Sequence, residues 1–93
     1  MTYYVYITTN PAKSVLYIGI TNSLPERMAQ HYAARGTDQT FAGRYFCYNL
    51  VYFEEHTDSK AAIAREKELK GWTQAKKEAL IVADNPQWAF FQT

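Results

Sequence analysis

The sequence predicts one domain of mixed α and β structure, the α/β (α+β) class, with the element order β-β-α-β-α-α. Aromatic and β-branched residues cluster in short segments that are typical of strands. Longer segments begin at Ser, Thr or Asp and end near Gly, as capped helices do. A chain of 93 residues is too short for two hydrophobic cores. We expect the domain to span residues 1–84 and residues 85–93 to form a C-terminal tail.

Two strands at the start of the chain are expected to form a β-hairpin. Residues 3–9 and 14–20 are rich in aromatic and β-branched side chains, and the sequence Asn-Pro-Ala-Lys between them has the composition of a turn. Side chains alternate between the two faces of a strand, so Tyr4 and Tyr6 should share one face. Residues 48–54 have a similar composition and predict a third strand.

A first helix is predicted from Ser23 to about Arg35, and Gly36 should end it. Ser23 and Glu26 form a capping-box pattern, in which each side chain accepts a hydrogen bond from the backbone of the other residue. The segment 37–46 lacks periodicity and contains a glycine, so it is expected to be a loop.

Two more helices are predicted in the second half of the chain. One starts at Thr57 or Asp58 and runs to Lys70, where a glycine follows. The other starts at Thr73 and runs to about residue 83, before an Asn-Pro pair. All three predicted helices are therefore short, amphipathic elements of a small domain.

The composition excludes several classes of protein. Hydrophobic residues make up 47% of the chain and charged residues 20%, with only 4 Gly and 3 Pro, which excludes disordered and collagen-like chains. Cys47 is the only cysteine, and no leader sequence follows Met1, so a reducing cytoplasmic location is expected. No apolar run approaches the 18 or so residues of a membrane span, so a soluble protein is expected.

The net charge of +1 does not by itself indicate a nucleic-acid partner. Its distribution is uneven, however, because residues 60–77 contain six basic residues against two acidic ones. A solvated helix surface explains such a stretch as well as a binding surface does.

Two polar residues of the first predicted helix border its apolar stripe. At 100° per residue, Leu24, Met28 and Tyr32 form the stripe, and Arg27 and His31 lie directly beside it. The structural alternative is that Arg27 covers the sheet edge with its aliphatic stem and His31 is a half-buried imidazole with a satisfied hydrogen bond. The functional alternative is a site at the edge of this helix.

Glu66 lies in a similar position on the second predicted helix. The apolar residues Ala62, Ile63 and Leu69 are three or four residues away, so the carboxylate lies on or beside the buried stripe. A carboxylate near a core needs a partner. An ion pair with Arg27 or a neighbouring lysine would satisfy it, and so would a hard metal ion such as Mg²⁺.

The order and spacing of these residues resemble the GIY-YIG nuclease superfamily, in particular its small stand-alone bacterial members. The matching pieces are Tyr4-Val5-Tyr6, Tyr17-Ile18-Gly19 eleven residues beyond Tyr6, Arg27 eight residues past Gly19, and Glu66 in a helix after the third strand. The similarity covers residues 3 to about 88. Each piece alone is weak, and the combination is specific.

The resemblance implies a three-stranded antiparallel sheet flanked by helices, with a one-metal site for phosphodiester hydrolysis on it. By position, Tyr6 and Tyr17 are the tyrosines of the two motifs. Arg27 would bind the phosphate and Glu66 the metal ion, Mg²⁺ or Mn²⁺. His31 stands where relatives carry a tyrosine or histidine.

Two departures from the family pattern affect the expected substrate contacts. Tyr4 replaces the glycine of the first motif, which alters the approach of the backbone to a substrate. Ile20 stands directly after the second motif, where the repair-nuclease branch has a lysine, so one phosphate contact is missing.

The expected function is therefore a divalent-metal-dependent endonuclease that acts on nucleic acid, with DNA as the expected substrate. The general base is either Tyr17 or His31, and the sequence leaves that choice open. Lys67, Lys70 and Lys76 are expected to follow the phosphate backbone.

Two other function classes stay open on the sequence. The first is a nucleic-acid-binding module that keeps the fold without efficient catalysis. The second is a protein-interaction domain that uses an aromatic surface formed by Trp72, Trp88, Phe90 and Phe91.

Overall fold

The computed structural model describes residues 1–92 and has the predicted order of strands and longer helices, with one short helix added. Within these residues the elements are β1 (Tyr3–Thr9), β2 (Leu16–Thr21), α1 (Leu24–Ala33), α2 (Phe41–Arg44), β3 (Asn49–His56), α3 (Ser59–Lys70) and α4 (Gln74–Asp84). The strands form one antiparallel sheet in the order β2-β1-β3. The predicted α+β class and three-stranded antiparallel sheet are confirmed.

The central strand β1 aligns its neighbours residue by residue. Tyr6 lies opposite Gly19 on β2 and opposite Phe53 on β3. The predicted hairpin between β1 and β2 is confirmed, and its turn is organised by Asn10, whose side-chain oxygen accepts hydrogen bonds from the backbone N–H groups of Ser14 and Val15. Residues far apart in the chain are therefore held side by side at the middle of the sheet.

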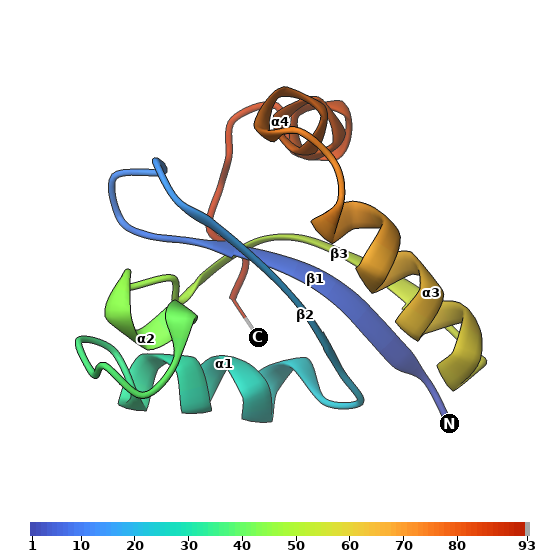
Figure 1. Ribbon diagram of the computed structural model, residues 1–93, viewed down its shortest axis with the longest axis horizontal. Helices are drawn as coiled ribbons and strands as arrows, with labels where there is room; N and C mark the ends of the chain where they lie inside the picture. The colour runs from blue at the N-terminus through green and yellow to red at the C-terminus, as the bar shows by residue number, and fades with distance from the viewer. Residues whose placement is uncertain (93) are drawn as a thin grey trace.

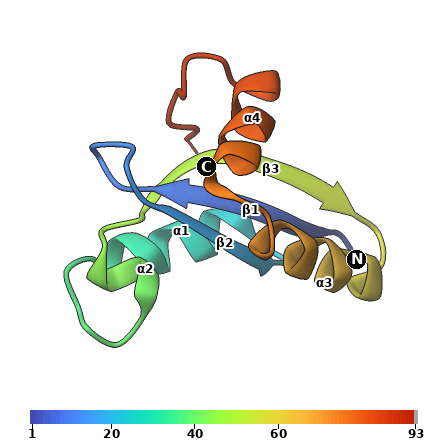
Figure 2. The same ribbon diagram turned by 45° about the horizontal axis from the view of Figure 1, so that its top comes forward.

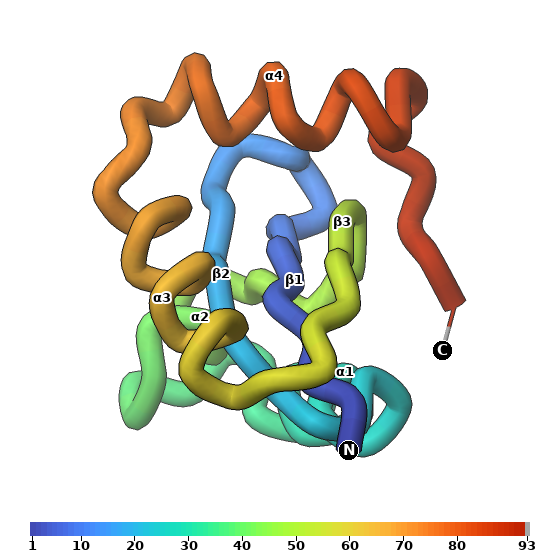
Figure 3. Tube along the Cα trace, turned by 90° about the vertical axis from the view of Figure 1, so that its right-hand side faces the viewer, coloured from blue at the N-terminus to red at the C-terminus, as the bar shows by residue number. Residues whose placement is uncertain are grey.

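The two faces of the sheet are covered by different helices. In Figure 1, α1 and α2 lie on one side of the sheet and α3 and α4 on the other, and Figure 3 shows the same layers from the side. Val5 and Ile7 pack with buried residues of α3 and α4, whereas Tyr6 packs with Leu24 and Met28 of α1. Tyr4 joins the same cluster as Tyr6, which confirms that the two tyrosines share a face.

The start of α1 differs from the predicted capping box. The Ser23 hydroxyl accepts a hydrogen bond from the Glu26 backbone N–H at 3.4 Å, as predicted. The prediction that the Glu26 side chain accepts a hydrogen bond from the Ser23 N–H is wrong, because this N–H donates to Thr21 Oγ1 at 3.1 Å. Thr21 is buried at the end of β2 and only two residues away, so its hydroxyl is a closer acceptor than the exposed Glu26 side chain.

The far end of α1 also differs from the prediction. Tyr32 was expected on the buried stripe, but it is 51% exposed, so this expectation is wrong. Its ring packs edge-on against Tyr48 at a centroid distance of 5.2 Å, and the Arg35 guanidinium lies over its other side. Only Leu24 and Met28 of this helix are buried, so its buried stripe ends before the last turn.

The expectation that residues 37–46 form only a loop is wrong, because they contain α2. Thr40 caps α2 through its side chain, which accepts a hydrogen bond from the Gly43 N–H at 2.9 Å. A Cβ atom on Gly43 would lie 2.7 Å from the Ala34 carbonyl oxygen, so glycine allows α2 to pack tightly beside the end of α1. Four residues are too few to produce a helical period in the sequence.

The caps of α3 and α4 are confirmed as Asp58 and Thr73. The expected stripe of α3 is only partly correct, because Ala62 and Leu69 are fully buried while Ile63 is 43% exposed. Helix α3 buries only those two residues, so its contact with the sheet is narrower than a regular amphipathic stripe.

The segment that follows α4 returns to the sheet, as the dark red end of the chain in Figures 2 and 3 shows. Asn85 is buried and its side-chain amide donates to the carbonyls of Val51 and Ala89, each at 2.9 Å. Further on, the Phe91 N–H donates to the Leu50 carbonyl at 2.8 Å. Separately, none of the helices in residues 1–92 has the length and apolarity needed to cross a membrane.

Candidate active site

A hydrogen bond between Tyr6 and His31 joins the central strand to α1. The Tyr6 hydroxyl lies 2.7 Å from His31 Nε2, and Tyr6 is fully buried. Burial raises the pKa of Tyr6, and Tyr17 raises it further, although Arg27 acts in the opposite direction. Tyr6 therefore keeps its proton near neutral pH, and its hydroxyl donates a hydrogen bond to His31 Nε2. The proton of the neutral imidazole is then on Nδ1.

His31 is neutral in this environment. Its pKa lies below the ordinary histidine value because the ring is partly buried, and the nearby Arg27 guanidinium lowers it further. A neutral imidazole can accept the Tyr6 proton, whereas a charged one could not. The structural alternative that the sequence left open for His31, a half-buried ring with a satisfied hydrogen bond, describes its resting contacts.

Tyr17 lies on β2 beside this pair. Its ring centroid is 5.4 Å from His31 and 6.3 Å from Tyr6. Tyr17, Arg27, Gln30 and His31 line a hollow of about 190 Å³, which we call the arginine hollow; the other lining residues are Ala34, Thr40 and Ala42. Two strands and α1 thus bring four of the predicted site residues together.

Gly19 leaves the space that Tyr6 occupies. The two residues lie opposite each other on β1 and β2, and a Cβ atom on Gly19 would lie 2.5 Å from the Tyr6 hydroxyl oxygen. No side-chain carbon can approach an oxygen that closely. The glycine of the second motif is therefore required by the position of the Tyr6 ring.

Glu66 lies on α3, on the other side of the sheet from α1. Its carboxylate is only 17% exposed, and one oxygen lies 3.5 Å from the Lys70 ammonium one helical turn later. Burial and Tyr17 raise the pKa of Tyr6, and the negative charge of Glu66 adds a smaller effect in the same direction. Among the partners that the sequence left open for Glu66, the neighbouring lysine is the one observed.

A second hollow lies beside Tyr17 and Lys70, the ion-pair partner of Glu66. It measures about 280 Å³ and is lined by Leu16, Tyr17, Ile18, Phe41, Lys70 and Lys77; we call it the lysine hollow. Tyr17 lines both hollows, and Lys70 pairs with Glu66 at the border of this one. The candidate metal ligand therefore contacts a residue that lines the lysine hollow, although Glu66 itself lines neither hollow.

The donor set fits a metal ion that is shared with a substrate. In the part of the chain that the structure describes, no group of three or more His, Cys, Asp or Glu side chains could enclose a metal. Glu66 supplies a single carboxylate. Mg²⁺ commonly takes only one or two carboxylates and completes its octahedron with water and phosphate oxygens, so one carboxylate beside a phosphate site is sufficient.

The predicted basic contacts are distributed unevenly. Lys70 lines the lysine hollow, but Lys67 is exposed on α3 and Lys76 lies 5.0 Å above the Trp72 ring, away from both hollows. Lys77 lines the lysine hollow although the sequence did not single it out. Helical spacing could not find it, because Lys70 and Lys77 belong to different helices and meet only after the turn between them.

Phe41 is another residue of the lysine hollow that sequence reasoning missed. It lies at the first position of α2, within the segment that was expected to be a loop. The threonine directly before it and the glycine two residues after it are a weak helix-cap signal that the sequence does offer. Its position next to Tyr17 follows only from the packing of α2 beside α1.

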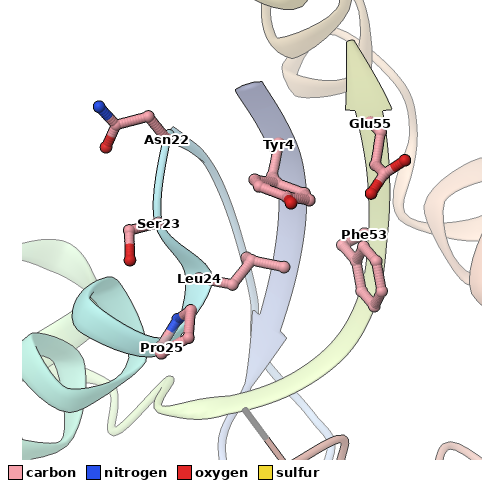
Figure 4. A pocket seen from close by; sticks show the side chains of 7 residues that line it. All are labelled: Tyr4, Asn22, Ser23, Leu24, Pro25, Phe53 and Glu55. Carbon is pink, nitrogen blue, oxygen red and sulfur yellow. The ribbon is translucent and has the colours of Figure 1, made fainter. Parts of the chain in front are cut away.

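Two other features of the molecule lie outside this site. A hollow of about 480 Å³, larger than the two described above, is lined by Tyr4, Asn22, Ser23, Leu24, Pro25, Phe53 and Glu55. Figure 4 shows Tyr4 between Leu24 and Phe53, with the Glu55 carboxylate on the same side. That negative charge disfavours a phosphate there, and none of the candidate catalytic residues lines this hollow.

A separate ion-pair cluster joins β3 to α3. Glu54 accepts hydrogen bonds from Tyr52 at 2.5 Å and from Arg65 at 2.8 Å, and Arg65 also donates to Glu68 at 2.9 Å. Burial raises the pKa of Glu54, but the hydrogen bonds from Arg65, Tyr52 and His56 outweigh it and leave the pKa below its ordinary value. Its members satisfy one another, as a structural cluster does.

His31 predicts a pH dependence of stability. Because its pKa is lowered by folding, the unfolded chain binds a proton below about pH 6.5 that the folded chain does not. The free energy of unfolding should therefore fall as the pH drops below about 6.5. Denaturant unfolding of the wild type and of His31→Gln between pH 5 and 7.5 checks this, because the glutamine carbonyl can still accept from Tyr6 but does not titrate. An equal slope in the two proteins would contradict the assignment.

Comparison with known proteins gives one consistent result. The family described as the GIY-YIG catalytic domain matches residues 2–79. UPF0213 proteins of Natronomonas pharaonis and Haloquadratum walsbyi are each 38% identical to this chain, over 79 residues (85% of this chain, 89% of the relative) and 78 residues (84% of both). The solution NMR structure of a UPF0213 protein from Bacillus halodurans is 28% identical, has a TM-score of 0.59 and covers 95% of this chain and 90% of that one.

Proposed function

The chain belongs to the GIY-YIG nuclease family, and from that premise we propose that it is an endonuclease that hydrolyses phosphodiester bonds, with DNA as its substrate and Mg²⁺ or Mn²⁺ as its cofactor. One observation carries the proposal. Tyr17, Arg27 and His31 line the arginine hollow, and the buried Tyr6 hydroxyl is hydrogen-bonded to His31. Glu66 is paired with Lys70, which lines the lysine hollow together with Tyr17. This arrangement supplies a phosphate contact, a proton acceptor and a metal ligand within one small area.

Arg27 is the proposed phosphate contact. Hydrolysis of a phosphodiester needs positive charge on the phosphoryl oxygens as negative charge develops on them. The planar guanidinium stays charged at every relevant pH and can donate two parallel hydrogen bonds to a phosphate. Arg27 is half-buried on α1, so its side chain is partly fixed before the substrate arrives.

The proposed general base is Tyr17, and His31 is the alternative. Tyr6 does not suit this role, because burial raises its pKa and its hydroxyl already donates a hydrogen bond to His31. Tyr17 lines both hollows, and Arg27 lines one of them with it. His31 titrates closer to neutral pH, but its Nε2 already accepts the Tyr6 proton, so it would first have to release that bond.

Glu66 is the proposed metal ligand. A bound Mg²⁺ or Mn²⁺ supplies positive charge to the phosphate and to the leaving oxygen. Glu66 would hold the ion through its carboxylate, and the Lys70 ammonium would move from the carboxylate towards a phosphate. Lys70 is about half exposed, so this movement requires no change in the core.

A cleavage assay tests the proposal. The purified protein is incubated with single-stranded, duplex and branched DNA, and with RNA of the same sequences, with Mg²⁺, with Mn²⁺ or with a chelator. We expect defined products with either metal and none with the chelator. Tight binding without products under all metal conditions would overturn the enzyme assignment and leave a nucleic-acid-binding module. If the wild-type protein neither bound nor cleaved any of these nucleic acids, both the endonuclease and the binding module would be overturned.

The basic stretch gives a second prediction. We propose that Lys67, Lys70 and Lys76 contribute to backbone binding, with Lys70 nearest the scissile phosphate. Replacing all three with Gln should weaken binding to all sequences equally and lower the slope of log affinity against log salt by about 2 to 3. Fluorescence anisotropy at several salt concentrations measures the slope. Unchanged affinity at low salt would make these lysines solubilising charges only.

A further inference from the structure

The lysine hollow is lined by two chemically different kinds of side chain. Phe41 and Tyr17 are aromatic, with ring planes inclined by only 25° and centroids 6.4 Å apart. Lys70 and Lys77, from α3 and α4, bring positive charge. Aromatic rings and ammonium groups around one hollow match the two parts of a nucleotide, which are a flat base and an anionic phosphate.

Phe41 is more exposed than is usual for a large aromatic side chain on a packed segment. Its side chain is 52% exposed, although it sits beside a partly buried tyrosine on a well-packed segment. The Tyr45 ring, at the residue that caps the end of α2, lies at a centroid distance of 4.7 Å, and Tyr45 is itself 43% exposed. A large aromatic ring that is half exposed and lines a hollow can stack with a ligand.

The segment that carries Phe41 is held in place before any ligand binds. Thr40 caps α2, and the Gly36 N–H donates to the Gly43 carbonyl at 2.8 Å. The Cys47 N–H donates to the Ala42 carbonyl at the same distance. A ring on such a segment loses little conformational freedom on binding, which favours affinity.

We propose that Phe41, supported by Tyr45, is a stacking site for an unpaired nucleobase, and that Lys77 binds the phosphate next to that base. The inference rests on the proposed function in one respect, because it places this nucleotide beside the phosphate that Arg27 contacts. The base must be unpaired, since a base within a duplex has its faces covered by its neighbours. The preferred substrate is therefore a single strand, or a duplex with unpaired nucleotides beside the cleaved bond.

The test compares strands with and without bases, with a chelator present so that cleavage cannot interfere. The probes are a fluorescent six-nucleotide oligo-dT, an all-abasic strand of the same length, and a twelve-base-pair duplex. Phe41→Ala should weaken binding of oligo-dT about 5- to 100-fold, as expected for the loss of one stacked base. It should change binding of the abasic strand and of the duplex by less than twofold, and Phe41→Trp should bind oligo-dT at least as well as the wild type.

Phe90→Ala is the matched control, because Phe90 is 41% exposed and lines neither hollow. It should bind all three probes as the wild type does, and melting temperatures should show that each variant is folded. If Phe41→Ala weakened binding of oligo-dT and of the abasic strand equally, the stacking site would be overturned. Unchanged affinity for both strands would overturn it too. If Phe41→Ala weakened binding of oligo-dT alone and the wild type showed no products in the cleavage assay, the stacking site would be supported and the proposed nuclease refuted.

Discussion

Replacing Glu66 with Gln is expected to lower the cleavage rate at least about 100-fold in Mg²⁺, the usual cost of losing one preorganised electrostatic contact in the transition state. Glutamine keeps the shape of the side chain but lacks the charge that attracts a divalent ion. Single-turnover cleavage at saturating protein measures the effect on the chemical step. The fold should be unaffected, because the partner of Glu66 is the half-exposed Lys70 and such pairs contribute about 0–1 kcal/mol.

Glu68→Gln is the matched control, because it removes a carboxylate from the same helix. Glu68 is 54% exposed and pairs with Arg65 on the side away from both hollows. It should cleave as the wild type does. If Glu66→Gln kept wild-type cleavage, or if it lost activity only because the protein unfolded in a metal-free thermal melt, the metal role of Glu66 would be refuted.

Gly19→Ala should destabilise the protein strongly for a change that adds a single methyl group. The added carbon would lie 2.5 Å from the Tyr6 hydroxyl oxygen and 2.6 Å from Cζ, and the fully buried Tyr6 ring has no free space to enter. We expect a loss of roughly 1–3 kcal/mol in the free energy of unfolding. Displacement of Tyr6 would also break its bond to His31, and a shift of about 1 Å in a site can lower the rate about 100-fold.

Gly71→Ala provides the comparison. A Cβ atom there would lie 3.5 Å from its nearest neighbour, the Glu68 carbonyl oxygen, and the residue has an ordinary helical φ of −82°. Alanine should therefore be neutral or stabilise by up to about 1 kcal/mol, because it restricts the unfolded chain. Urea unfolding of both variants checks the pair. Equal stabilities would mean that Tyr6 moves aside at little cost.

The strands and the three longer helices could be predicted because their signals are local. The caps at Asp58 and Thr73 hydrogen-bond to residues within three positions in the chain, so composition and spacing are sufficient to place them. The candidate residues Arg27 and Glu66 were found for the same reason, since helical periodicity places a polar side chain beside an apolar stripe. Both are partly buried in the structure.

Local sequence patterns were sufficient to predict the α+β fold, the order of its elements and the residue types of the candidate site, because periodicity and capping depend on near neighbours. The contacts between these residues could be found only in the folded structure. The Tyr6 hydroxyl meets His31, 25 residues away, and Phe41 and Lys77 meet across the lysine hollow. Such contacts depend on how β1 aligns with its neighbours and on how tightly α2 packs beside α1, and no local pattern encodes either distance.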